Sequence, residues 1–348
     1  MVRDYSQFMP NVKPPAPTPL AALGWQTHFA MQVTPEALSQ APPIRVTRVD
    51  RVEVHVTDGE TTWTLPPIAD VAVGDWVLPT QPPTILDRKS LLKRRAAGHE
   101  RSVQLIAANI DTVFVVTSCN ADFNVARLER FLALTFDAGA DPVIVLTKAD
   151  QSDPAPYLAQ AQGLSKEVAC VAVNAKDSAA AEAFAPWCRP GCTVAFLGTS
   201  GVGKSTLLNA LLGEDLAATG TIREDDARGR HTTTRRELHV TPGGFAVLDT
   251  PGMRELQLTD VAAGISEVFS DITDLAGACK FNDCAHEAEP GCAVRAAIAA
   301  GQIDPARLER WRKLAAEDAF NSADLAERRR KDKAFGKTVK QALRSKRR

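Results

Sequence analysis

A glycine-rich run that ends in lysine and serine is the part of the chain with the clearest chemistry. The run GTSGVGKS occupies residues 198–205, between the apolar stretch TVAFL and the segment TLLNALLG. Glycines let such a loop turn successive backbone N–H groups inward, where they bind phosphate oxygens at the N-terminus of a helix. Lys204 would lie between the β- and γ-phosphates of a nucleotide, and Ser205 would offer its hydroxyl to Mg²⁺. The predicted phosphate-binding residues are Gly198, Thr199, Ser200, Gly201, Val202, Gly203, Lys204, Ser205 and Thr206.

A carboxylate at the end of the apolar run FAVL is the second chemical group. Asp249 begins the sequence DTPG, and a carboxylate at a strand end can hold the Mg²⁺ shell through water. The N–H of Gly252 can approach a γ-phosphate closely because glycine has no side chain. Thr233 or Thr234, in the polar stretch before this strand, is expected to complete the Mg²⁺ coordination when the γ-phosphate is present. A polar loop with capping threonines is the alternative interpretation of that stretch.

His231 precedes these threonines and is a candidate for a catalytic role. Many nucleotide switches carry a glutamine directly after the glycine of the carboxylate motif, where it orients the attacking water. Met253 occupies that place here, and a thioether can neither accept a proton nor hold the water. We therefore expect slow intrinsic hydrolysis, with His231 as a candidate group once a partner stimulates it. A histidine that only contacts RNA is the alternative.

A segment before the phosphate loop predicts which base is bound. TKAD, residues 147–150, follows the apolar run PVIVL. At such a strand end an aspartate can accept hydrogen bonds from guanine N1–H and the exocyclic amine, while a lysine stem packs over the ring. Adenine offers no matching donor pair, so ATP would leave the carboxylate unpaired and be rejected. The predicted base-binding residues are Thr147, Lys148, Ala149 and Asp150, with Asn174 and Ala175 beside the guanine oxygen.

A cluster of metal-ligand types follows the last of these motifs. Cys279, Cys284, His286 and Cys292 have the spacing C-x4-C-x-H-x5-C. Three thiolates and one imidazole form a closed tetrahedral set for Zn²⁺ with no position left for water, so we predict one structural zinc ion. Chance proximity is the alternative. The remaining cysteines, in or near apolar segments, are expected to be core thiols: Cys119, Cys170, Cys188 and Cys192.

The hydrophobic patterns predict the elements that position these groups. Unbroken apolar runs at 111–116, 142–147, 168–173 and 193–198 alternate with helical patterns, which is typical of a doubly wound parallel α/β sheet. Alternating runs between residues 44 and 78 predict a small all-β barrel, either an oligonucleotide-binding or an SH3-like one. Residues 304–320 predict an N-capped helix.

Length, composition and charge set the boundaries of the prediction. At 348 residues with 45% hydrophobic content, the chain can fill two or three domain cores. We expect a flexible leader (1–39), a β domain (40–98), a nucleotide-binding domain (99–258), a mostly α zinc domain (259–325) and a basic tail (326–348). The tail carries eleven lysines and arginines against two acidic residues, whereas the whole chain has a net charge of −1. This asymmetry favours a polyanionic partner, with a solvated, disordered end as the alternative.

The composition also argues against a membrane-spanning, an exported or a disulfide-rich protein. No run of eighteen apolar residues is present, and the start lacks the apolar core of a signal peptide. Seven cysteines without an export signal favour a reducing cytoplasm over a disulfide framework. We expect a cytoplasmic monomer with no membrane partner.

The order of the motifs resembles a known family. TKAD before GTSGVGKST, then HTTT, DTPGM and the cysteine–histidine cluster, together with the small β domain, resemble the small ribosomal subunit-dependent GTPase A family over residues 40–340. The resemblance implies an N-terminal oligonucleotide-binding fold (OB-fold), a circularly permuted GTPase core and a zinc domain. It also implies binding to the small ribosomal subunit and its rRNA, and ribosome-stimulated GTP hydrolysis during late subunit maturation. Thr147 replaces the commoner asparagine and Asn174 the commoner serine.

Two other classes of function compete with this prediction. A P-loop ATPase or nucleotide kinase would use the same loop, but TKAD argues against adenine. A non-catalytic, nucleotide-regulated RNA-binding protein would need no intact catalytic groups, and Lys204, Ser205 and Asp249 are present. In-line attack of water, with charge stabilised by Lys204, Mg²⁺ and the loop amides, is the mechanism we expect.

Overall fold

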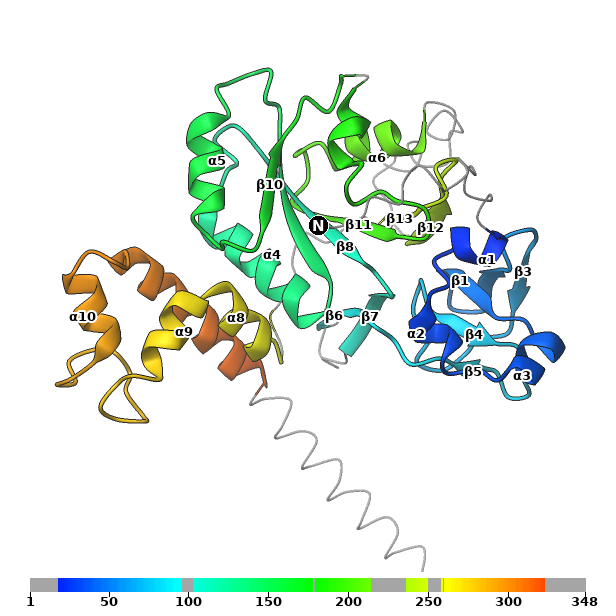
Figure 1. The fold of residues 1–348 in the computed structure, drawn as a ribbon, viewed down its shortest axis with the longest axis horizontal. Helices are drawn as coiled ribbons and strands as arrows, with labels where there is room; N and C mark the ends of the chain where they lie inside the picture. Colours follow the sequence, from blue (N-terminus) through cyan, green and yellow to red (C-terminus); the bar gives the residue numbers. More distant parts are fainter. Residues whose placement is uncertain are drawn as a thin grey trace, which may run out of the picture.

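Three units lie side by side in the computed structural model: a β unit, a central α/β unit and a helical C-terminal unit (Figure 1). The structure describes residues 18–95, 103–177, 179–213, 236–249, 258 and 260–322.

The central unit is built on a parallel sheet whose strand order is β10-β9-β8-β11-β13, with β12 antiparallel at its side. The strands are β8 (Thr112–Ser118), β9 (Asp141–Thr147), β10 (Ala169–Ala172), β11 (Thr193–Leu197), β12 (Glu237–Val240) and β13 (Ala246–Asp249). Every residue of β8 and β11 is buried, as strands covered on both faces require. This confirms the doubly wound α/β sheet expected from the apolar runs.

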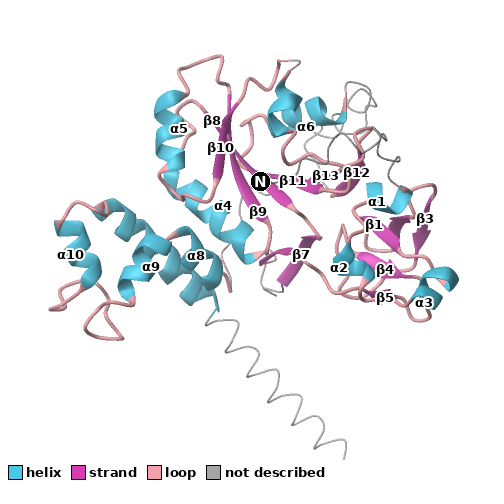
Figure 2. Cartoon of the chain, in the orientation of Figure 1, coloured by secondary structure: helices cyan, strands magenta, loops and turns pink. Residues whose placement is uncertain are grey.

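Helices cover both faces of the sheet, as Figure 2 shows. The core on one face contains residues of α4 (Val125–Asp137) and α5 (Ala155–Gln162), and the core on the other contains residues of η2 (Ala180–Phe184) and α6 (Lys204–Leu212). The side chain of Asn124 caps α4 by accepting a hydrogen bond from the N–H of Arg127 at 2.9 Å. The apolar positions of α4 then face the sheet, with Leu128 and Leu132 buried.

The β unit contains five antiparallel strands in which β1 pairs with both β2 and β4, β2 with β3, and β4 with β5. They are β1 (Ile44–Val49), β2 (Val54–Thr57), β3 (Thr62–Leu65), β4 (Trp76–Leu78) and β5 (Thr84–Ile85). This pairing is that of a partly open, five-stranded OB-fold. The sequence alone did not separate this fold from an SH3-like barrel.

One strand pairing that the sequence did not predict joins the two sheets. β1 pairs antiparallel with β12 at Arg48 and Glu237, so the β unit and the central unit share one eleven-stranded sheet. A hairpin of β6 (Leu91–Arg95) and β7 (Val103–Ala108) forms a separate two-stranded sheet at the same junction. The predicted domain boundary at residue 98 falls between these paired strands, so it divides a hairpin.

The predicted flexible leader is wrong for residues 18–39. Three short helices lie there, α1 (Pro19–Ala22), α2 (Thr27–Ala30) and α3 (Pro35–Gln40), and Thr18 and Thr34 cap two of them. Leu23 and Phe29 are each 1% exposed and pack on Trp76 of the β unit. The proline-rich composition suggested flexibility, but apolar residues spaced between the prolines bury enough surface to hold the segment. Residues 1–17 lie outside the described part of the chain.

The C-terminal unit is helical, as expected. It contains α8 (Ala262–Val268), α9 (Ser270–Ala276), α10 (Ala293–Ala299) and a helix over residues 305–322. Asp304 caps the last helix, since its carboxylate accepts a hydrogen bond from the N–H of Ala306 at 3.0 Å. None of the helices in the described ranges combines the length and apolarity needed to cross a lipid bilayer.

Candidate nucleotide and metal sites

The phosphate loop lies between the carboxyl end of β11 and the first turn of α6, as predicted. Gly201 and Gly203 have φ values of 80° and 97°, the left-handed region that glycine adopts without strain. Position 198 requires glycine because the loop packs directly on β8. A Cβ at this position would come within 2.4 Å of the carbonyl oxygen of Val116. The loop therefore lies against the neighbouring strand and opens toward solvent at Ser200 and Gly201, which are exposed.

The lysine of this loop is held by the loop itself. Lys204 Nζ donates hydrogen bonds to the carbonyl oxygens of Gly198 at 2.8 Å and Thr199 at 2.7 Å. On nucleotide binding, the ammonium group would exchange these carbonyls for phosphate oxygens. Ser205 and Thr206 are exposed in the first turn of α6, so the Ser205 hydroxyl is accessible to a cation beside those phosphates.

The base-reading segment and the phosphate loop meet through Thr147. Its hydroxyl, at the end of β9, contacts the carbonyl oxygens of Val202 at 2.6 Å and Thr117 at 3.0 Å. Gly203 packs on the same side chain, because a Cβ at this glycine would lie 3.5 Å from the Thr147 hydroxyl oxygen. The strand ends predicted to bind the base and the phosphates thus lie at one edge of the sheet.

The remaining base-binding candidates follow Thr147 directly or come from the adjacent strand. Lys148 has a φ of 58° and Asp150 is exposed, so the chain turns sharply away from the sheet at this point. The N–H of Ala149 donates to the carbonyl of Val173 at 3.4 Å, which ties the segment to the end of β10. Asn174 and Ala175 follow Val173 and are half-buried.

Of the residues predicted to bind Mg²⁺, to sense the γ-phosphate or to assist the attacking water, the structure describes only some. Asp249 ends β13, which lies parallel to β11, so its backbone reaches the same edge as the phosphate loop. The side chain of Asp249 lies outside the described part of the structure, as do four whole residues: His231, Thr233, Thr234 and Gly252.

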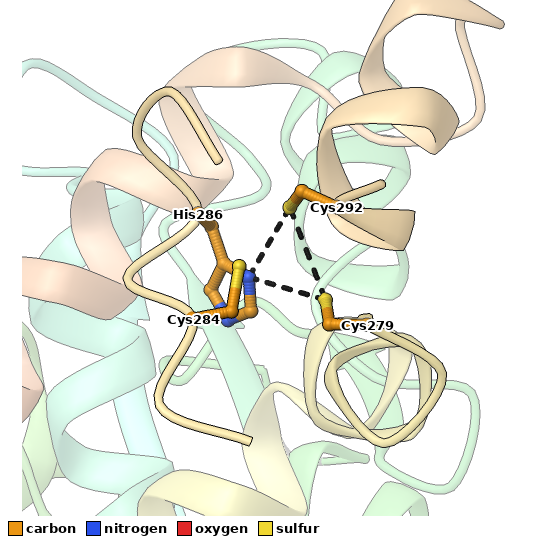
Figure 3. A group of neighbouring side chains, drawn as sticks. All are labelled: Cys279, Cys284, His286 and Cys292. Atoms are coloured by element: carbon orange, nitrogen blue, oxygen red, sulfur yellow. Dashed lines mark hydrogen bonds between the residues drawn. The ribbon is translucent and has the colours of Figure 1, made fainter. Parts of the chain in front are cut away.

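The four metal-ligand candidates come together in the C-terminal unit (Figure 3). His286 Nδ1 lies 3.6 Å from Cys279 Sγ and 3.4 Å from Cys292 Sγ, and these two sulfurs are 3.9 Å apart. The ligand atoms of all four residues lie within 4.8 Å of one another. Atoms bound to one tetrahedral zinc ion at about 2.0–2.3 Å would be separated by about 3.5–3.8 Å, so the cluster fits such an ion. It can hold a metal ion.

Local structure prepares these side chains for a cation. Burial opposes ionisation of the Cys279 thiol, but the backbone N–H groups of Ala293 and Val294, at the start of α10, outweigh it and lower its pKa. Burial and the neighbouring thiols raise the pKa of Cys284 to about 11. A bound cation would relieve this repulsion between adjacent thiolates. His286 is 4% exposed, with its ring centroid 5.7 Å from that of Trp311.

Two residues that support these sites were not predicted. Glu289 lies between the ligands, and its carboxylate accepts hydrogen bonds from the N–H groups of Ala285, Glu287 and Ala288 at 2.8–3.0 Å. The backbone N–H of Glu289 itself, together with these three N–H groups, lowers the pKa of the Glu289 carboxyl to about 2. Three acidic residues lie between the first and last ligands, Asp283, Glu287 and Glu289, and no local signal singles out Glu289. Arg127 of α4 is the second, with Nη1 3.4 Å from the Thr199 hydroxyl oxygen.

The other cysteines behave as ordinary thiols. Cys119 is buried, while the other three are half-buried and unpaired by disulfides. Burial raises the pKa of Cys170 to about 11 and that of Cys188 to about 12, so both stay protonated at neutral pH.

Comparison with known proteins gives a consistent result. The family model described as RsgA GTPase matches residues 85–259. A Mesorhizobium japonicum protein named small ribosomal subunit biogenesis GTPase RsgA is 51% identical, covering 87% of this chain and 91% of its own length. A Vibrio parahaemolyticus protein named small ribosomal subunit biogenesis GTPase RsgA 2 is 45% identical, covering 94% of each chain.

Two solved structures share the fold. YjeQ from Thermotoga maritima matches with a TM-score of 0.59 and 26% identity, over 79% of this chain and 97% of its own. YloQ, described as a circularly permuted GTPase, matches with a TM-score of 0.55 and 23% identity, over 80% of this chain and 94% of its own. The second likeness concerns the fold alone.

Proposed function

The chain belongs to the RsgA GTPase family, and from this premise we propose that it binds the small ribosomal subunit and hydrolyses GTP on it during late maturation. It is a GTP-hydrolysing enzyme of ribosome biogenesis. The contact of the Thr147 hydroxyl with Val202 carries the proposal, because it joins the guanine-reading strand end to the phosphate loop. We place the activity in the cytoplasm and in a monomer.

In the proposed mechanism the phosphate loop binds the phosphates, and residues at the neighbouring strand ends bind Mg²⁺ and the base. The loop amides and the Lys204 ammonium stabilise charge on the transferring phosphoryl group, while water attacks in line. Mg²⁺ supplies further charge neutralisation when bound, and Ser205, Asp249 and one of Thr233 and Thr234 would hold it. Asp150 and Lys148 select guanine, and Asn174 with Ala175 lies beside the guanine oxygen.

The metal ion of the C-terminal unit is proposed to be zinc. The donor set is three sulfurs and one imidazole nitrogen within 4.8 Å of one another, a set of four that suits tetrahedral zinc and leaves no position for a reacting water. Its role is therefore to hold α9, α10 and the loop between them together.

The test is a hydrolysis assay on the full chain with GTP or ATP, with and without purified small ribosomal subunits. We expect slow GTP turnover alone, a large increase with subunits, and no comparable turnover of ATP. Lys204→Ala should abolish the stimulated rate. Equal turnover of ATP, or no response to the subunits, would contradict the proposal.

His231 is the group proposed to assist the attacking water. His231→Ala should lose most of the subunit-stimulated rate while retaining GTP affinity, which a fluorescent nucleotide titration measures. An unchanged stimulated rate would remove His231 from the mechanism.

The basic tail is proposed to contact rRNA phosphates. Residues 326–348 have a net charge of +9, and each phosphate neutralised by a cationic side chain releases a counterion. A chain truncated before Ala326 should bind small subunits more weakly, with a shallower dependence of affinity on salt concentration. The same slope in both chains would show that the tail makes no such contacts.

A further inference from the structure

One side chain in the first turn of helix α4 contacts the phosphate loop. Arg127, in its first turn, lies with Nη1 3.4 Å from the hydroxyl oxygen of Thr199 and 3.4 Å from the carbonyl oxygen of Asp122. Thr199 also provides one of the two carbonyls that hold the Lys204 ammonium. A nucleotide that draws Lys204 onto its phosphates therefore changes the bonding of a residue that α4 touches.

The next turn of α4 carries a carboxylate buried inside the contact with the C-terminal unit. Glu129 is 0% exposed, and Arg310 Nε lies 3.0 and 2.8 Å from its two carboxylate oxygens. Arg307 Nη1 approaches the same carboxylate at 3.3 Å. Burial raises the pKa of Glu129, and the two guanidinium groups oppose this shift.

Most of the contacts of Arg307 lie within the C-terminal unit, and its guanidinium also donates to the carbonyl oxygen of Leu164 in the central unit at 3.1 Å. Its guanidinium is paired with Asp271 of α9 at 2.7 Å and donates to the carbonyl oxygen of Val268 at 2.8 Å. It also lies over the ring of Phe269, 4.8 Å from the centroid. The carboxylate of Glu129 is thus bound by groups whose positions are set by α8, α9 and the helix over residues 305–322.

Two further contacts join α4 to the C-terminal unit. Arg130 Nη1 pairs with Glu317 Oε1 at 2.7 Å. Gly264 of α8 crosses α4 so closely that a Cβ there would come within 1.9 Å of the carbonyl oxygen of Ala133. Residues 129–133 of α4 therefore contact the C-terminal unit at Glu129, Arg130 and Ala133.

We propose that α4 transmits nucleotide occupancy from the phosphate loop to the metal-binding C-terminal unit, and that the Glu129–Arg310 pair is the joint. A helix moves as a rigid element, and a buried ion pair tolerates only a narrow range of geometries. A small shift of the first turn of α4 must therefore move the C-terminal unit with it or break the pair. The inference rests on nucleotide binding at the phosphate loop and adds a physical connection within the described residues.

Thermodynamic linkage makes the coupling measurable in the protein without ribosomes. If nucleotide favours one conformation of the C-terminal unit, that conformation must in turn raise nucleotide affinity by the same factor, typically about 5-fold or more. The experiment compares amide hydrogen exchange over residues 261–322 of the metal-loaded full chain, free, with GDP, and with a non-hydrolysable GTP analogue. A fluorescent nucleotide titration is run on the same samples.

The variants are Glu129→Gln, which preserves shape, and Arg312→Gln as the matched control. Arg312 lies two positions from Arg310 on the same helix, but it pairs with Glu309 at 2.8 Å and donates to the carbonyl oxygen of Ala285 at 3.1 Å, both within its own unit. We expect nucleotide to change exchange in the wild type and in Arg312→Gln by at least about 5-fold, and in Glu129→Gln by less than about 2-fold. Because removing one partner of a buried ion pair can unfold a protein, the double variant Glu129→Gln/Arg310→Gln repeats the test without an unpaired charge.

A nucleotide-dependent exchange that persists unchanged in Glu129→Gln and in the double variant overturns the inference. So does a wild type that binds nucleotide in the titration but shows no change over residues 261–322. A wild type that binds no guanine nucleotide contradicts the proposed function as well, so the two failures are distinguishable.

Discussion

At the scale of single residues, Thr147 stands where the family more commonly has asparagine, and it still connects the end of β9 to the phosphate loop. A side-chain amide could bridge neighbouring backbone groups with separate donor and acceptor atoms. The threonine hydroxyl reaches two carbonyl oxygens, those of Val202 and Thr117, from one atom. Its methyl group packs against Gly203, 3.6 Å from where a Cβ would lie.

Thr147→Ala should lower guanine nucleotide affinity about tenfold. A buried carbonyl left without a partner costs about 1–3 kcal/mol, and the free loop can relax to meet water whereas the bound loop cannot. Titration with fluorescent GDP measures the effect. Thr147→Ser keeps the hydroxyl and should bind as the wild type does; a similar loss in both variants would show that the methyl group matters instead.

Cys292→Ala should release the metal ion to a chelator that does not remove it from the wild type. The cluster needs four ligands for closed tetrahedral coordination, and Cys292 also accepts a hydrogen bond from the N–H of Arg295 at the start of α10. Elemental analysis after dialysis gives the metal content. Cys188→Ser is the matched control, and equal metal loss from it would place the ion elsewhere.

At the scale of elements, the crossing of α4 and α8 carries the contact between the central and C-terminal units. Glycine inside a helix is unfavourable by about 1 kcal/mol, so its presence at position 264 needs a reason. The near contact with the backbone at Ala133 is that reason. A side chain at position 264 would push the two helices apart and strain the buried pairs of Glu129.

Gly264→Ala should lower the free energy of unfolding by about 1–3 kcal/mol, the usual cost of overpacking. Urea denaturation measures it. At Gly277 a Cβ would meet only the carbonyl oxygen of Asp274 at 3.5 Å, and the backbone is helical with φ −62°. Gly277→Ala should therefore be neutral or stabilising by about 0.4–1 kcal/mol, and a loss as large as that of Gly264→Ala would refute the packing argument.

At the scale of the whole molecule, a buried arginine connects three segments distant in sequence. Arg45 of β1 is 1% exposed and donates to the carbonyl oxygens of Leu23, Gly74 and Asn109. These belong to the N-terminal helices, the β unit and the entry to the central sheet. Burial lowers the pKa of Arg45 to about 10, so it stays charged at neutral pH.

Arg45→Met should lower the free energy of unfolding by about 3 kcal/mol or more, because hydrogen bonds to a charged group are worth about 1.5–3 kcal/mol each and their acceptors would stay buried. Thermal and urea unfolding of the full chain test this. Arg48→Met, three residues along the same strand, removes a partly exposed pair with Asp50 and should cost less than about 1 kcal/mol. Equal losses would contradict the connecting role.

The sequence by itself determined the chemistry and the order of the parts. Phosphate loops, base-reading segments and zinc ligands depend on residue types at short spacings, and buried parallel strands depend on unbroken apolar runs. Local patterns of this kind were enough to predict the α/β sheet, the position of the loop and the four ligands that lie together at residues 279–292.

Only the tertiary structure decided how the units are joined. Glu129 lies in an amphipathic helix and would be assigned to solvent from its sequence, yet the helix over residues 305–322 buries it against two arginines. The pairing of β1 with β12 and the packing of Phe29 on the β unit are equally absent from any local pattern. Such contacts arise between segments tens to hundreds of residues apart, and their energy depends on which surfaces the whole fold brings together.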